Sequence, residues 1–123
     1  MIGNISNLEI GSAVRTKLNA AIDKVNQHCE PAIYRALLNQ SGGSAPTATV
    51  LTNTLGGTVV WSRTSAGSYA ASLAGAFNAN KTFLVLCHPT AVVFRLDANT
   101  VDLTTGGADD LLGDTSLEIL VYP

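Results

Sequence analysis

Few side chains in this sequence could act as a nucleophile or a general base. The 123 residues contain two histidines, His28 and His88, and two cysteines, Cys29 and Cys87. Neither histidine belongs to a G-x-S-x-G motif, in which a serine nucleophile is presented to its base. His28 ends a predicted helix, where a cation suits the helix dipole, and His88 precedes a proline at the end of a predicted strand. We therefore predict no catalytic residue, and we expect that the protein is not an enzyme.

The oxygen-bearing side chains and the glycine pairs also lack the order that a metal or a phosphate requires. Asp97, Asn99 and Asp102 offer oxygen ligands of the kind that calcium prefers, but they lack the alternating acidic order of a calcium loop, and a turn followed by a hairpin accounts for them. The glycine pairs have no phosphate-binding lysine beside them. We predict no metal site and no cofactor.

The composition indicates which partners the chain can take. Only 13% of the residues are charged and the formal net charge is −2, which argues against a nucleic-acid partner because such proteins carry a basic stripe. Low charge with much Ala, Thr, Ser and Gly favours a surface that meets other protein, although a rigid β domain of low charge would look the same. No apolar run approaches roughly 18 residues, so we predict no membrane insertion.

The two cysteines differ in setting, since Cys29 follows the predicted helix and Cys87 lies in an apolar segment. We expect small hydrophobic side chains in a reducing compartment. The alternative is a disulfide between Cys29 and Cys87.

The most legible element is a β-hairpin within residues 57–85. Residues 58–64 and 68–74 alternate in character, and the loop between them ends at Gly67, where glycine adopts a left-handed conformation without a Cβ clash. The predicted pairs are Val59 with Leu73, Trp61 with Ala71 and Arg63 with Tyr69. All the large side chains then share one face, so Trp61 is expected in the core.

Two further strand predictions follow from apolar patterns. Thr82–His88 is apolar on both faces, which predicts a central strand covered on each side. Residues 91–96 and 101–104 predict a second hairpin with a four-residue loop. Its expected pairs are Leu96 with Val101, Phe94 with Leu103 and, on the outer face, Arg95 with Asp102.

Strand patterns also occur in residues 32–40, 47–55 and 116–122. The fold class is therefore mainly β, with residues 31–123 forming a single β-sandwich or jelly-roll-like domain of about seven short antiparallel strands.

Residues 1–30 differ from the rest and are predicted to be an arm followed by an amphipathic helix over residues 13–27, with Ser12 as its N-cap. An apolar stripe runs along that helix, on Val14, Leu18, Ala21, Ile22 and Val25. The stripe either packs on its own domain or joins copies of the chain in a bundle. The arm carries four spaced apolar residues, Ile2, Ile5, Leu8 and Ile10.

Residues 11–26, GSAVRTKLNAAIDKVN, resemble a "VRTKLNAAID"-type helix that recurs in bacteriophage tail and fibre proteins. Residues 34–85 and the ending SLEILVYP are similar to a small β domain of phage and prophage virion proteins. The resemblance implies a structural component of the virion, commonly trimeric, that acts as a short fibre, a head fibre or a capsid or tail decoration. It transfers no functional residue.

We therefore expect a homotrimer located in the virion, with the helix stripe as its interface and the apolar residues of the arm contacting other virion proteins. The alternative is a glycan- or receptor-binding module that takes a host surface glycan. Its binding rim would be the loops Ser41–Pro46 and Thr105–Asp114, with Tyr122 as the freest aromatic side chain for stacking.

Overall fold

Eight antiparallel strands make up the domain in the computed structural model, which describes residues 30–123. The predicted arm and helix, and with them the proposed attachment and interface residues, lie outside the described residues. The strands are β1 (Ala32–Asn39), β2 (Thr47–Asn53), β3 (Val60–Ser65), β4 (Ser68–Ser72), β5 (Thr82–Leu86), β6 (Val92–Asp97), β7 (Thr100–Thr104) and β8 (Thr115–Val121).

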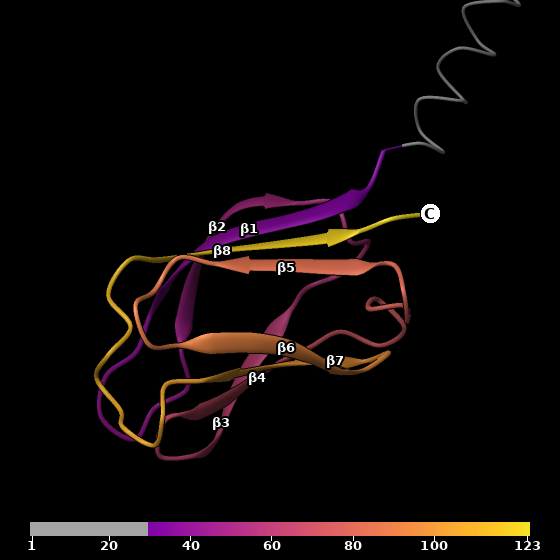
Figure 1. Ribbon diagram of the computed structural model, residues 1–123. Helices are drawn as coiled ribbons and strands as arrows, with labels where there is room; N and C mark the ends of the chain where they lie inside the picture. The colour runs from indigo at the N-terminus through magenta and orange to yellow at the C-terminus, as the bar shows by residue number, and fades with distance from the viewer. Residues whose placement is uncertain (1–29) are drawn as a thin grey trace, which may run out of the picture. The chain divides into compact units, whose positions relative to one another are not determined.

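These strands form two four-stranded sheets that face each other as two layers (Figure 1). The first sheet has the order β2-β1-β8-β5, and the second has the order β3-β4-β7-β6. The mainly β prediction is confirmed for residues 30–123, with eight strands instead of about seven. The predicted loops Ser41–Pro46 and Thr105–Asp114 contain no strand.

Alternating residues of the central strands build the core. In β1 the inward side chains are Tyr34, Ala36 and Leu38, and in β8 they belong to Leu117, Ile119 and Val121. Period-two alternation of this kind is typical of strands with one buried face. Phe77, from the segment between β4 and β5, is fully buried in the same cluster, so that a loop residue completes the hydrophobic core.

The first hairpin has the predicted register. Trp61 pairs with Ala71 and Arg63 with Tyr69, while Gly67 has a positive φ of 69°. The loop is tighter than predicted, because Ser65 already pairs with Ser68 across a register shift. Trp61 packs against the core while partly buried, and its indole Nε1 donates a hydrogen bond to Tyr34 Oη at 3.2 Å.

The predicted register of the second hairpin is wrong by one residue. Asp97 Oδ1 accepts a hydrogen bond from the Asn99 amide at 2.8 Å, which closes the turn over two residues instead of four and leaves a register shift between Arg95 and Asp97. A slip of one residue sends every side chain to the opposite face. The observed pairs are Val93 with Leu103, Phe94 with Asp102 and Arg95 with Val101.

This one-residue shift exchanges the inward and outward faces of β6 for its charged and apolar residues. Arg95 no longer forms the predicted outer pair with Asp102, and its Nε instead donates to the Phe77 carbonyl oxygen at 2.6 Å. Phe94 and Leu96, expected to face inward, are exposed. The outer face of the second sheet therefore carries apolar side chains along its β6 edge.

The prediction that Thr82–His88 is a central strand is also wrong. β5 lies at the edge of the first sheet and pairs with β8. Leu84 and Leu86 pack against the core, whereas Phe83 is 56% exposed and Val85 is exposed as well. The strand is apolar on both faces although, among residues 30–123, no side chain covers the outer one.

Phe77 offers a test of the described core. We expect Phe77→Ala to lower the free energy of unfolding by about 3–5 kcal/mol, because it removes a buried aromatic ring and leaves a cavity. Urea unfolding of the full chain measures the change, with Val60→Ala as a control at a position that is 61% exposed. A loss below about 1 kcal/mol for Phe77→Ala would contradict this assignment of the core.

Candidate functional site

The residues singled out for chemistry have structural roles in the described part of the chain. His88 Nδ1 accepts hydrogen bonds from the backbone amides of Thr90 and Ala91 at 3.1 and 2.9 Å. Its Nε2 lies 3.0 Å from the Leu111 carbonyl oxygen, so Nε2 carries the proton and donates it there. Both ring nitrogens are thus occupied in holding the β5–β6 connection against the loop after β7.

No group of three or more His, Cys, Asp or Glu residues that could hold a metal ion occurs within residues 30–123. Asp97 and Asn99 close the β6–β7 turn. Asn99 also accepts a hydrogen bond from the Gly75 amide through its Oδ1 at 2.8 Å. Cys87 is exposed and forms no disulfide within residues 30–123, and any pairing with Cys29 falls outside the described residues. The same range contains no helix long and apolar enough to span a membrane.

At one end of the sandwich, the carboxylate of Asp109 gathers four donors. Arg63 contributes Nε at 3.2 Å and Nη2 at 2.7 Å, Tyr69 contributes its hydroxyl at 2.7 Å, and Gly67 contributes its amide at 3.0 Å. Hydrogen bonds from Arg63, then Tyr69 and Gly67, hold the pKa of Asp109 well below its usual range. Burial and the bond to Asp109 raise the pKa of Tyr69 to about 12.

Gln40 ties the two predicted rim loops together. Its side-chain amide donates to the carbonyl oxygens of Gly42 and Ser44 at 2.7 and 3.0 Å, and its Oε1 accepts from the Asp110 amide at 2.8 Å. Asp110 in turn accepts from the Gly42 amide at 2.6 Å. The loops Ser41–Pro46 and Thr105–Asp114 therefore lie side by side.

A polar pocket of about 340 Å³ opens at this end. It is lined by Asn39, Gln40, Ser41, Ser44, Ala45, Thr47 and Leu112. Hydroxyl and amide groups could form hydrogen bonds with a polar ligand. No aromatic side chain lines the pocket, and Tyr122, the residue considered for stacking, follows β8 and is not among these lining residues.

The second candidate surface is the outer face of the first sheet, which we call the apolar face. Register places Ile33, Leu120 and Phe83 in one row across the strands, and Arg35, Glu118 and Val85 in the next. Leu37 and Ser116 form a third pair, and the Cys87 amide bonds the Ser116 carbonyl oxygen. Most of these side chains are apolar, although they point away from the core.

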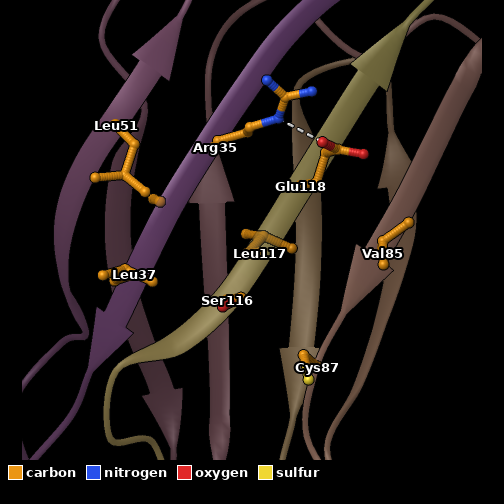
Figure 2. Close-up of a pocket in the computed structure, with 9 residues that line it drawn as sticks. Arg35, Leu37, Leu51, Val85, Cys87, Ser116, Leu117 and Glu118 are labelled. Carbon is orange, nitrogen blue, oxygen red and sulfur yellow. Dashed lines mark hydrogen bonds and ion pairs between the residues drawn. The ribbon is translucent and has the colours of Figure 1, made fainter.

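A shallow depression of about 240 Å³ lies in the apolar face between these strands (Figure 2). Leu37 and Leu51 line it from β1 and β2, while Val85 and Cys87 line it from β5 and the segment after it. Arg35 and Glu118 approach each other across β1 and β8, with 2.5 Å between Nε and Oε2. An ion pair thus stands within an otherwise apolar surface.

Sequence reasoning missed Asp109 and the apolar face. The available signal for Asp109 was Arg63 beside Tyr69 on the inward face of a predicted hairpin, which calls for an acidic partner from elsewhere in the chain. The signal for the apolar face was a strand, β5, with apolar residues on both sides.

Comparison with known proteins adds no relative, because no protein-family model, no curated protein and no solved structure matches this chain.

The Asp109 cluster predicts a dependence of stability on pH. Because the pKa of Asp109 is lowered in the folded state, its contribution is complete above the unfolded carboxyl pKa of about 4 and is lost as the pH falls below that value. We expect Asp109→Asn to be less stable than the parent at pH 7 and to lose less stability between pH 7 and pH 2. Urea unfolding at both pH values measures this, with the exposed Glu30→Gln as control. An equal acid loss in Asp109→Asn and the parent would contradict the prediction.

Proposed function

We propose that this chain is a structural subunit of a bacteriophage particle, namely a short fibre, a head fibre or a capsid or tail decoration, that assembles as a homotrimer in the virion. The observation that carries the proposal is the exposure of large apolar side chains on the outer faces of both sheets. They are Leu51, Phe83 and Val85 on the first sheet and Val60, Val92, Phe94 and Leu96 on the second. Apolar surface gathered in this way marks contact with other protein.

Low charge supports the same proposal. Only 13% of the residues are charged, so electrostatic repulsion between copies of the chain is weak. The phage origin is supported by the resemblance of residues 11–26 and 34–85 to virion proteins. The arm residues Ile2, Ile5, Leu8 and Ile10 are proposed to contact other virion proteins, and the helix stripe to join the copies.

Light scattering of the purified full chain at micromolar concentration tests the oligomer. We expect a mass three times the 12.7 kDa of one chain. Leu18→Asp should abolish assembly while circular dichroism keeps its β signal, because a carboxylate in the stripe would lose its water in a bundle. Asn19→Asp, on the polar side of the predicted helix, is the control. A clean monomer for the parent chain would overturn the proposal.

A second function is favoured by one observation, the polar pocket between loops that Gln40 joins at one end of the sandwich. There the protein would bind a host-surface glycan, through hydrogen bonds without a stacking partner. A glycan array probed with the full chain should then show binding that Ser44→Trp, which fills the pocket, reduces at least tenfold. Ser62→Trp on the second sheet should leave binding unchanged. Absence of any retained glycan would argue against this function.

A further inference from the structure

The apolar face consists of two halves with complementary features. The β2–β1 half carries Leu51, Leu37 and Arg35, and the β8–β5 half carries Glu118, Val85 and Phe83. Arg35, Glu118 and Val85 lie in one row of the register. One half thus has a positive charge and the other a negative charge at the same height along the strands.

Arg35 and Glu118 can each bind a further charged group. The side chains of Arg35 and Glu118 are 49% and 30% exposed, and the contact between them uses Nε of the guanidinium. A guanidinium has five N–H donors in a planar fork. Within residues 30–123, no hydrogen bond engages the terminal nitrogens of Arg35, so they remain able to bind a second carboxylate.

The size of the face limits what can cover it. Four strands about 4.8 Å apart, with 5–8 residues each at roughly 3.3 Å per residue, give a footprint of roughly 300–500 Å². This footprint includes the polar side chains of Arg35, Glu118 and Ser116. It is about half of the roughly 800 Å² that each partner buries in a standard interface, so the face supplies part of a larger contact.

We propose that a second copy of this chain covers the apolar face, with the β2–β1 half of one copy against the β8–β5 half of the next. Rotation about a symmetry axis that runs along the strands brings opposite halves together. It sets Arg35 of one copy beside Glu118 of its neighbour, and Leu51 beside Val85 and Phe83. The acyl layer of a lipid surface would remove water from the Arg35–Glu118 pair and offer neither charge a second partner, whereas another copy supplies one for each.

This inference rests on the proposed self-assembly and adds which surface makes the contact. The first experiment compares Phe83→Asp with Ser62→Asp in the full chain. Both positions are exposed on strands at the edge of a sheet, but Ser62 lies on β3 of the second sheet and is not one of its exposed apolar residues. Analytical ultracentrifugation should show the dissociation constant for self-association raised at least tenfold by Phe83→Asp and changed less than twofold by Ser62→Asp.

The second experiment separates contacts within a chain from contacts between copies. Arg35→Glu puts two acidic residues on the face and Glu118→Arg puts two basic ones, so each variant alone should associate more weakly than the parent. Mixing the two variants should raise association above that of either variant alone, because opposite charges then meet at two of the three contacts in a mixed trimer. Mixing cannot restore the ion pair within either chain, so the rescue reports the contact between copies alone.

The outcomes of the two experiments are distinguishable. A parent chain that stays monomeric overturns the proposed self-assembly and this inference with it. A parent chain that assembles, with Phe83→Asp and Ser62→Asp equally harmless, overturns only this inference and indicates that some other occupant covers the face. Failure of the charge-reversed pair to regain association on mixing would overturn the proposed pairing of the two halves.

Discussion

The carboxylate of Asp109 is the contact on which one whole end of the sandwich depends. It receives both ends of the β3–β4 turn, through Arg63, Tyr69 and the Gly67 amide. A side chain at Gly67 would meet the Ala108 amide nitrogen at 2.5 Å, so the loop packs as closely as glycine permits. Once residues 105–114 are held here, Asp110 is placed to bind the other loop at Gly42. Hydrogen bonds thereby join two loops that are far apart in the sequence into one continuous surface.

The sequence predicts a strand register correctly where the contact that sets the register lies between residues close together in the chain and has a recognisable residue pattern. The β3–β4 register was predictable because the turn is adjacent in sequence and Gly67 accepts a positive φ. The β6–β7 register was not, because a single bond from the Asn99 amide to Asp97 chose a shorter turn than the alternating pattern suggested. The sequence predicted the positions of both strands correctly, but it assigned the side chains of β6 to the wrong faces of the sheet.

Non-local contacts explain the remaining differences between prediction and structure. Asp109 lies more than 40 residues from Arg63, and no spacing rule links an acidic loop to a hairpin so far upstream. The pattern of β5 is ambiguous for a different reason. Apolar residues on both faces of β5 indicate that both faces are suited to burial. They do not indicate whether the residues that bury each face belong to the same chain. In this domain Leu84 packs inward and Phe83 outward, so the apolar pattern of β5 extends beyond what the core of residues 30–123 buries.

The pairing of β1 with β8 also has a mechanical consequence. Ala32, at the start of the first strand, lies opposite Val121, at the end of the last, so both ends of the domain leave the first sheet at the same end of its two central strands (Figure 1). A pulling force applied between those two ends would separate β1 and β8 like a zipper, breaking one pair of bridges after another. The strands would resist such tension far less than they would resist sliding along their length, where all bridges must break together.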